Sequence, residues 1–305
     1  MPEQILAALA PAGERVLLDG TIGLGGHAQA WLDAGGGHSR VVGFDRDLAA
    51  INATRTRLLT YGERVLLIHA DYRDAVTEWT RRGLARPDAV LLDLGLGSHQ
   101  LDDPERGFSF RHDARLDMRF DRDHPGPTAA EILAQSSEPE LARIFLEYGE
   151  ERAGRKLARR IVDTRRREPL QTTRQLAELV RNCIPRQGGG RRPRIDPATK
   201  TFQALRIAVN HELEGLGETI EALVALLAPG GRIAIIAFHS LEDRIAKHVL
   251  RRLATEIPLQ PGDDPAKLPK ALLEMPQRRV VLPSTEEAAR NPRARSAKLR
   301  WGIRR

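Results

Sequence analysis

The chain has 305 residues, a hydrophobic content of 41%, a formal net charge of +7 and a sequence pI of about 10.0. This length can bury a sizeable core in one or two domains. No apolar run is long enough to span a bilayer, and the first residues show no signal peptide, so we expect a cytoplasmic protein without a membrane partner. The basic charge favours a polyanionic partner such as a nucleic acid.

The cysteine and arginine content adds two expectations. The single cysteine, Cys183, excludes a disulfide or a cysteine metal site within one chain, and the apolar stripe around it predicts a buried structural thiol. We expect no bound metal. Basic residues cluster in a loop at 186–194 and again from Arg290 to Arg305, a pattern that favours RNA.

Five short apolar runs predict the strands of a parallel sheet. Because each run is continuous rather than alternating, it is typical of a strand buried on both faces. The first four runs alternate with segments of helix length, which predicts a doubly wound α/β fold. The runs are 15–18, 40–44, 64–68, 89–92 and 232–237.

Acidic residues follow the first four of these strands. Asp19, Asp45 and Asp93 come at or just after a strand end, and Asp71 lies a little further on. Ligands of open α/β sheets bind at the carboxyl ends of the strands. Four carboxylates at one edge would repel each other, so the pattern indicates a binding site rather than a stabilising device.

A glycine-rich turn, Asp19-Gly-Thr-Ile-Gly-Leu-Gly-Gly-His27, follows the first predicted strand. Glycines allow positive φ and a close approach of ligand to backbone. Asp45, an acid about 20 residues beyond such a turn, is placed to accept both ribose hydroxyls of an adenosine. The turn also fits the dinucleotide pattern Gly23-x-Gly25-x-x-Ala28, so the turn alone leaves nicotinamide and adenosylmethionine enzymes open.

The long interval between the fourth and fifth strands carries helical patterns. Ser137-x-x-Glu140 and Thr172-x-x-Gln175 are capping boxes that predict two helix starts. We therefore predict a helical domain at 121–200, inserted into a sheet domain formed by 1–120 and 201–305.

Three further elements are expected in the second half of the chain. Apolar residues from Leu213 to Leu227 share one face of a long helix that returns to the sheet. The proline-rich segment 258–276 predicts a surface loop. The segments 280–282 and 298–301 predict an antiparallel pair.

Several long segments resemble a known family. They are Asp19-Gly-Thr…Gly-Gly-His27, Gln100-Leu-Asp-Asp…Arg106-Gly-Phe-Ser-Phe-Arg-His112, Leu116-Asp-Met-Arg119, Thr201-Phe-Gln-Ala-Leu-Arg-Ile-Ala-Val-Asn210, Phe238-His-Ser-Leu-Glu-Asp-Arg244 and Asn291-Pro-Arg-Ala-Arg-Ser-Ala-Lys-Leu-Arg300. The chain resembles bacterial methyltransferases that methylate the exocyclic N4 of a cytidine in small-subunit ribosomal RNA. The resemblance implies a Rossmann-like class I fold with a helical insertion, S-adenosyl-L-methionine as cofactor and small-subunit ribosomal RNA as partner. A helical insertion with a basic loop offers a broad docking surface, so we expect the RNA to be bound within the assembled small subunit.

The resemblance also implies a cofactor site. In it, Gly25, Gly26 and His27 contact the methionine part of the cofactor. Asp45 holds the ribose, and the ring of Tyr72 packs on adenine. Asp93 faces the amino and sulfonium groups, and Gln100 completes the pocket. Three of these residues have a structural alternative. His27 could cap the following helix, Tyr72 could be an ordinary half-buried aromatic, and Gln100 could be a surface loop residue.

On the substrate side, Asp117 and His239 are candidates to hold the target amine or take its proton. A structural hydrogen bond within a turn is the alternative for each. Phe108 and Phe110 are candidates to stack on a flipped-out base, with core packing as the alternative.

The chain departs from the family pattern at three places, of which the mildest is Tyr72, where a phenylalanine is common. It lacks the family's His-x-Pro entry near the N-terminus, and Leu96-Gly-Ser-His99 replaces Val-Ser-Ser-Pro on the acceptor side of the pocket. Two other functions stay open at this stage, a non-catalytic ribosome-assembly factor that retains the fold and an NAD-dependent dehydrogenase. The methylated nucleotide, the assembly stage of the substrate and a homodimer are also undetermined.

Overall fold

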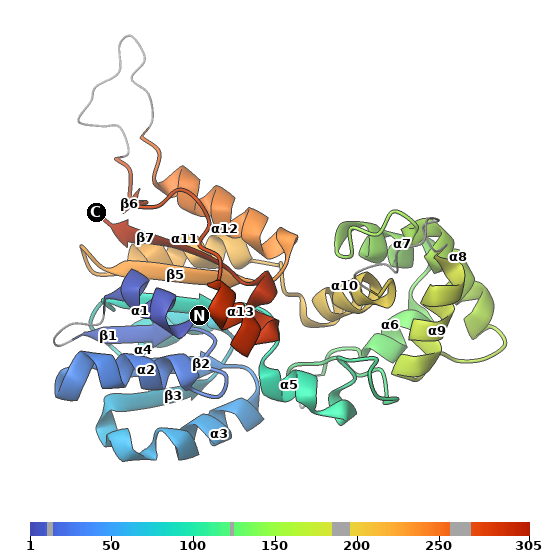
Figure 1. The fold of residues 1–305 in the computed structure, drawn as a ribbon, viewed down its shortest axis with the longest axis horizontal. Coiled ribbons are helices and arrows are strands. Elements are labelled where there is room, and N and C mark those ends of the chain that lie inside the picture. Colours follow the sequence, from blue (N-terminus) through green and yellow to red (C-terminus); the bar gives the residue numbers. More distant parts are fainter. Residues whose placement is uncertain (11–14, 123–124, 185–195, 257–269) are drawn as a thin grey trace, which may run out of the picture. The chain divides into compact units, whose positions relative to one another are not determined.

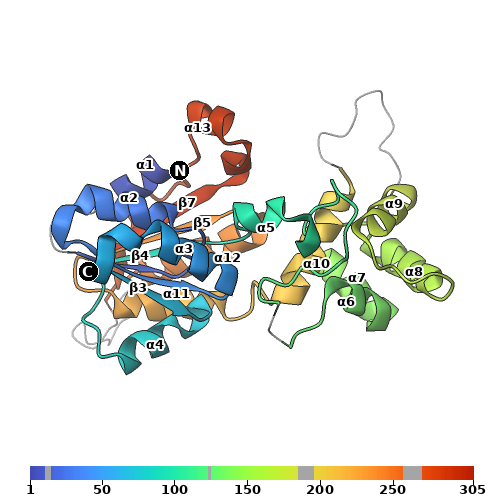
Figure 2. The same ribbon diagram turned by 90° about the horizontal axis from the view of Figure 1, so that it is seen from below.

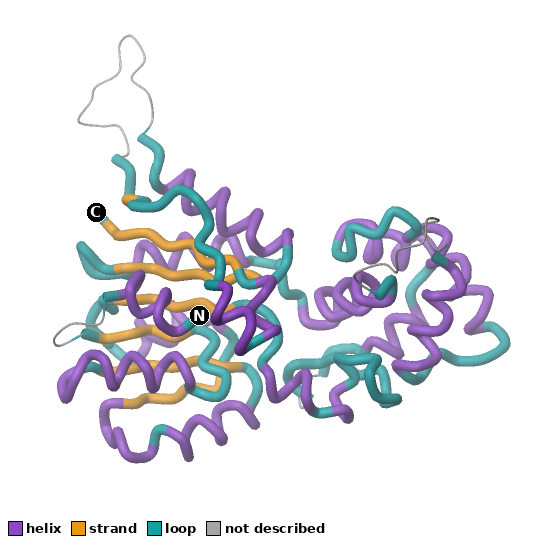
Figure 3. The backbone as a smooth tube through the Cα atoms, in the orientation of Figure 1, coloured by secondary structure: helices purple, strands orange, loops and turns teal. Residues whose placement is uncertain are grey.

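The structure, a computed structural model, describes the chain except for residues 11–14, 123–124, 185–195 and 257–269. The described residues form two compact units. The sheet unit comprises Met1–Gly95 and Glu214–Arg305, and the helical unit comprises Leu96–Leu213. Figure 3 shows strands in the sheet unit, whereas the described part of the helical unit consists of helices and loops.

The sheet unit is built on a seven-stranded sheet with the order β3-β2-β1-β4-β5-β7-β6 (Figure 1). Strands β1 to β5 are parallel, and β7 runs antiparallel to both of its neighbours. The five runs predicted from the sequence are these five parallel strands. The strands are β1 (Val16–Asp19), β2 (Arg40–Asp45), β3 (Val65–His69), β4 (Ala89–Asp93), β5 (Arg232–Ala237), β6 (Leu273–Glu274) and β7 (Lys298–Arg304).

Helices cover both faces of this sheet (Figures 1 and 2). Neighbouring residues of β1 enter different cores, Leu17 packing with α1 and α2 and Leu18 with α4 and α11. Successive side chains of a strand point to opposite faces, so two covered faces require an unbroken apolar run. The helices are α1 (Pro2–Leu9), α2 (Gly26–Gly35), α3 (Leu48–Arg57), α4 (Ala75–Arg81), α11 (Leu216–Leu226), α12 (Ser240–Leu253) and α13 (Thr285–Arg290).

The C-terminal strand pairs differently from the prediction. Strand β7 pairs with β5 along its length, from Arg232↔Ile303 to Ala237↔Lys298, and with β6 on its other side. The predicted partner segment contributes a single bridge, Val281↔Leu299. The predicted loop at 258–276 contains β6, while its part at 257–269 lies outside the described residues. Local sequence could not reveal this pairing, because the partner strands are far apart along the chain.

The helical unit contains six α-helices within its described residues, and its core is separate from those of the sheet. Both predicted capping boxes are confirmed, at the start of α7 and at the start of α9. Cys183 is buried in this core, as predicted. The helices are α5 (Ser98–Asp102), α6 (Ala129–Gln135), α7 (Glu138–Glu147), α8 (Gly154–Arg165), α9 (Thr173–Cys183) and α10 (Ala198–Asn210).

The helical unit begins at Leu96, earlier than the predicted boundary at 121. The reason is that Phe108, Leu116 and Phe120 pack into the same core as α7 to α10. This stretch carries little helical periodicity, so its membership of the unit is decided by packing.

In the described part of the chain, no helix combines the length and the apolar character needed to cross a membrane.

Candidate functional site

The acids predicted to gather at one edge lie on neighbouring strands. Strand β1 lies between β2 and β4, and Asp19, Asp45 and Asp93 are their last residues. Asp19 is aligned with Gly43 on one side and Leu91 on the other. The carboxyl ends of these three parallel strands therefore form the site edge that the sequence predicted.

The glycine turn after β1 is fixed to the neighbouring elements by hydrogen bonds. The Gly23 amide donates to Asp45 Oδ2 at 2.9 Å, and the Thr54 hydroxyl of α3 donates to the Gly23 carbonyl at 2.6 Å. Arg57, one turn further along α3, donates to the Leu24 carbonyl at 2.9 Å. The backbone of the turn is thus anchored to β2 and α3.

Gly25 and Gly26 differ in what their lack of a side chain permits. Gly25 has φ of 75°, and a Cβ there would lie 2.8 Å from Thr54 Cγ2. The fold itself therefore requires glycine at this position. At Gly26 a Cβ would meet nothing closer than Arg57 Nη1 at 3.9 Å. Since packing of the protein does not demand glycine there, Gly26 leaves open space that a ligand can use.

The Asp45 carboxylate is oriented by two backbone amides. Gly23 donates to Oδ2, and Asp47 donates to Oδ1, both at 2.9 Å. Each carboxylate oxygen has two lone pairs, so one backbone amide does not exhaust its capacity as an acceptor. This arrangement suits a pair of adjacent hydroxyl groups such as those of a ribose.

Asp93 carries the clearest sign of a ligand. Its Oδ2 lies 3.3 Å from His27 Nε2, whereas its Oδ1 is buried and has no hydrogen-bond partner among the described residues. A buried acceptor without a donor is energetically unfavourable, and such atoms are rare in folded proteins. An ammonium group would satisfy Oδ1, so the residues present fit the amino end of S-adenosylmethionine.

The charges around this edge are strongly coupled. Burial raises the pKa of the Asp19 carboxyl to about 7, opposed only in part by His27 and by the Thr21 amide. For His27, burial disfavours the imidazolium, but Asp93 and Asp19 outweigh it and raise the pKa above its ordinary value. The ring of His27 thus interacts with Asp93 instead of capping α2, whose N-cap is Gly25.

We expect Asp19→Asn to flatten the pH dependence of the unfolding free energy of the cofactor-free protein. A raised pKa means that the folded chain binds the proton more tightly. The stabilisation is therefore complete below the ordinary value of 3.8 and is lost as the pH rises through about 7. A shift of about 3 pH units sets an upper limit of about 4 kcal/mol.

Denaturant titrations at several pH values measure this effect. The raised pKa of His27 acts in the same direction, since its contribution is lost as the pH rises above the ordinary value of 6.5. The wild-type protein should lose stability relative to Asp19→Asn between about pH 4 and 7. Parallel stability curves for the two proteins would contradict the expectation.

Asp71 and Tyr72 stand beyond the third strand, and their contacts are structural. Burial disfavours the Asp71 carboxylate, but Arg73 at 2.7 Å and Arg46 at 3.5 Å hold its pKa below the usual value. Tyr72 is half-buried against the core between the sheet and helices α4 and α11, and it lies beside Gly20. Its packing on adenine stays a prediction.

Gln100 belongs to the helical unit. Its side chain is 6% exposed and accepts a hydrogen bond from the Gly97 amide at 3.1 Å, at the start of α5. Gln100 is therefore not a surface loop residue. Its place in the cofactor pocket stays a prediction.

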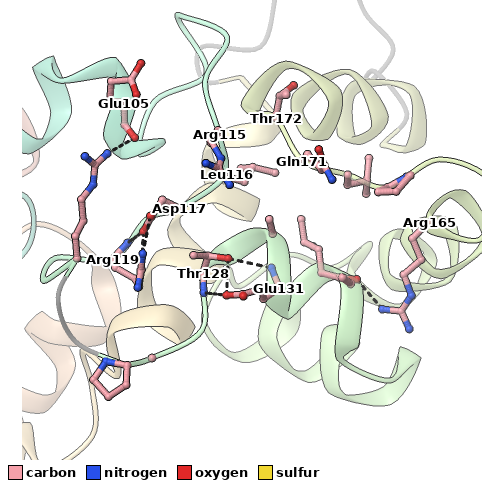
Figure 4. A pocket seen from close by; sticks show the side chains of 18 residues that line it. Glu105, Arg115, Leu116, Asp117, Arg119, Thr128, Glu131, Arg165, Gln171 and Thr172 are labelled. Atoms are coloured by element: carbon pink, nitrogen blue, oxygen red, sulfur yellow. Dashed lines mark hydrogen bonds and ion pairs between the residues drawn. The ribbon is translucent and has the colours of Figure 1, made fainter.

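Asp117 lines a cavity of about 940 Å³ within the helical unit (Figure 4). Its two oxygens accept from Arg119 at 2.9 and 3.0 Å. Although burial opposes ionisation, Arg119 holds the pKa of Asp117 below its usual value. At neutral pH this carboxylate is a hydrogen-bond acceptor and a poor proton acceptor. Arg115, Glu131 and Thr172 also line the cavity.

His239 has a structural role at the start of α12. It is 8% exposed, and its Nδ1 accepts from the Glu242 amide at 3.4 Å, while Glu242 Oε2 accepts from the amide of Phe238. These contacts are structural hydrogen bonds within a turn, which is the alternative to a catalytic role for His239. A catalytic role for His239 stays a prediction and has no support from these contacts.

The two candidate stacking residues are packed within the helical unit. Phe108 is buried and stacks on Phe120 with ring centroids 5.5 Å apart. Phe110 is half-buried, in edge contact with Phe202, and Arg181 lies over its ring at 5.5 Å. The contacts of Phe108 are those of a core residue, whereas Phe110 is only partly buried and packs against that core.

Sequence reasoning missed the residues that shape the turn from outside it. Thr54 and Arg57 reach the turn from α3, and the Thr21 hydroxyl accepts from the Asp93 amide at 2.7 Å. The only sequence signal for the first two is that they lie three residues apart, on one helix face. Their partners are set by the placement of α3 against β2 and β3.

The fold and the site together define a class of protein. A sheet of order β3-β2-β1-β4-β5-β7-β6 with an antiparallel β7, a glycine turn after β1 and acids ending β1, β2 and β4 are the features of class I S-adenosylmethionine-dependent methyltransferases. A model of the MraW methylase family matches residues 1–305, and the chain belongs to this family. S-adenosyl-L-methionine is its cofactor, and the dehydrogenase interpretation of the glycine turn is wrong.

Similar proteins span the same length. The chain is 49% identical to a protein of Syntrophotalea carbinolica and 46% identical to one of Trichlorobacter lovleyi. Each match covers 98% of this chain and 95% of the relative. Both relatives are named ribosomal RNA small subunit methyltransferase H.

Proposed function

We propose that this protein transfers a methyl group from S-adenosyl-L-methionine to the exocyclic N4 of a cytidine in the decoding region of small-subunit ribosomal RNA. The substrate class is supported by relatives of 44–49% identity that carry the name of a small-subunit ribosomal RNA methyltransferase. The unpartnered, buried Asp93 Oδ1 is the observation in this chain that carries the cofactor site. The base and its position are inferred from the resemblance of the segments around Asp117 and His239.

The cofactor supplies a methyl group on a sulfonium, which is already a good leaving group, so positioning and electrostatics contribute most of the catalysis. In the proposal Asp45 holds the ribose, Asp93 holds the amino group, and Gly26 leaves room for the methionine chain. His27, paired with Asp93, keeps that carboxylate oriented. These four residues bind and orient the cofactor.

The acceptor amine is a poor nucleophile because its lone pair is delocalised into the ring. Asp117, held ionised by Arg119, is suited to accept a hydrogen bond from this amine and so to turn its lone pair out of conjugation. The proton that the amine loses on methylation passes to the solvent. We propose the helical unit as the part that recognises the RNA, and the cytoplasm as the location.

Methyl transfer from labelled S-adenosylmethionine to small ribosomal subunits tests the proposal. The subunits come from a strain that lacks this protein, and nucleoside mass spectrometry identifies the product. We expect N4-methylcytidine at one site, and a comparison of free RNA with assembled subunits shows which form is the substrate. Absence of label with intact cofactor binding would instead support a non-catalytic assembly factor.

A further inference from the structure

Helix α8 presents a dense array of positive charge to solvent. Its buried residues are Gly154, Leu157, Ala158 and Ile161, and the last three pack into the helical core. Exposed basic residues lie on the rest of the helix and just beyond both of its ends. Within α8 they are Arg155, Lys156, Arg159 and Arg160, while Arg152 precedes the helix and Arg166 and Arg167 follow it. The helix packs against α7 and α9 (Figure 2).

Few of these charges are neutralised within the protein. Arg159 lies 3.5 Å from Glu138, and Arg166 lies 3.9 Å from Asp163, both in exposed pairs. Exposed ion pairs of this kind contribute little to the stability of the protein. Arg152, Arg155 and Arg167 have no hydrogen bond or ion pair through their side chains in the described part of the chain.

A helix that only needs to be soluble mixes charges of both signs. Helix α7 of the same unit does so, with Arg143 and Glu147 paired at 3.1 Å across one turn. Helix α8 has one acid, Asp163, against five basic residues, and its Arg155 and Arg159 are like charges four residues apart, a spacing that destabilises a helix. The array therefore reduces the stability of the isolated protein, and a bound polyanion would relieve the repulsion.

We propose that this face of α8 is a docking surface for the sugar-phosphate backbone of RNA. The proposal rests on the proposed function and names the surface of the helical unit that contacts the substrate. At 1.5 Å per residue, the eleven steps from Arg155 to Arg166 span about 17 Å, which is long enough to follow several phosphates. Guanidinium groups bind phosphate oxygens in a two-pronged geometry that lysine cannot reproduce.

The composition of the face indicates which part of an RNA it contacts. Helix α8 contains no aromatic residue, so it offers no platform on which bases could stack. Phosphate contacts fix register and orientation without reading sequence. The array is therefore a positioning surface. Because the apolar residues of α8 are buried in the core or, as Val162 is, packed against it, the face also lacks the apolar side chains that insert into a membrane surface.

A charge-matched pair of triple variants tests the proposal. The test variant carries Arg155→Gln, Arg159→Gln and Arg160→Gln. The control carries Arg55→Gln, Arg81→Gln and Arg251→Gln, three exposed helix positions of the sheet unit. Both remove three positive charges, and glutamine is a good helix former, so both should fold. Equal melting temperatures verify this.

Binding of small-subunit ribosomal RNA is measured against salt concentration. We expect the α8 variant to bind at least about tenfold more weakly than wild type near physiological salt. Its slope of log K against log salt should be shallower by about 2, because three phosphate contacts are lost. The control should change by less than about twofold. An Arg→Lys triple at the same α8 positions should keep most of the slope.

Several results would overturn the proposal. Equal losses in the test and control variants would show that net charge, not this array, drives binding. Binding of wild type to vesicles of anionic phospholipid that the α8 variant loses, with RNA binding retained, would assign the face to a membrane. Unchanged RNA binding by the α8 variant, with methyl transfer intact in wild type, would refute this surface alone. Absent methyl transfer by wild type, with the salt effect present, would refute only the proposed function.

Discussion

Asp93→Asn is expected to weaken S-adenosylmethionine binding by about 10- to 100-fold while changing the unfolding free energy by less than about 1 kcal/mol. The Oδ1 atom of Asp93 has no partner among the described residues, and its Oδ2 makes one partly exposed contact with His27. The folded protein therefore loses little. A charge-assisted hydrogen bond to an ammonium contributes about 1.5–3 kcal/mol, which converts to the affinity loss given.

Asp71→Asn is the matched control, because the same chemical change is made near the same edge of the sheet. Asp71 is paired with Arg73 and Arg46, so its substitution should lower stability and affect cofactor affinity much less. Calorimetric titration with the cofactor and denaturant unfolding measure the two quantities. If Asp93→Asn binds the cofactor as wild type does, the assignment of the amino group to Asp93 is wrong.

Although the two residues are neighbours, Gly25→Ala is expected to lower the stability of the fold, whereas Gly26→Ala is expected to lower the affinity for the cofactor. Gly25→Ala should destabilise the fold by about 2 kcal/mol or more, because its φ is positive and its Cβ would press on Thr54. Gly26→Ala should leave stability unchanged or slightly higher, since the Cβ meets open space in the first turn of α2. The same Cβ fills the space assigned to methionine, so cofactor affinity should fall by about tenfold or more.

Gly37→Ala provides the control for a general effect of removing glycine. Nothing lies within 4 Å of a Cβ at Gly37, and its φ is not positive. Thermal melting and cofactor titration of the three variants separate fold from site. Wild-type cofactor affinity in a stable Gly26→Ala protein would show that the methionine chain does not pass this residue.

The local physics of the sequence was sufficient for much of the fold. Strands buried on both faces need unbroken apolar runs, and all five parallel strands were found by this rule. Helix starts at Ser137 and Thr172 were found because capping is a contact between residues three apart. The acids Asp19, Asp45 and Asp93 could be assigned to one edge, because parallel strands bring their carboxyl ends together.

The glycine turn also separates what sequence and structure can decide. Sequence marked Gly25 and Gly26 alike as glycines that admit a ligand. Only the position of Thr54 shows that the fold itself requires the first, while the second borders open space. Likewise, the sequence singled out His239 as a catalytic candidate, and its contacts with Glu242 show a helix cap.

The sequence by itself determined the elements with local signals, which are the parallel strands, the capped helices, the glycine turn and the acids at the strand ends. Only the tertiary structure decided the pairing of β7 with β5 and β6, the start of the helical unit at Leu96, and the unpartnered oxygen of Asp93. The physical reason is one of distance along the chain. Capping and strand burial are recorded in neighbouring residues, whereas pairing, packing and unsatisfied polar atoms depend on residues that only the folded chain brings together.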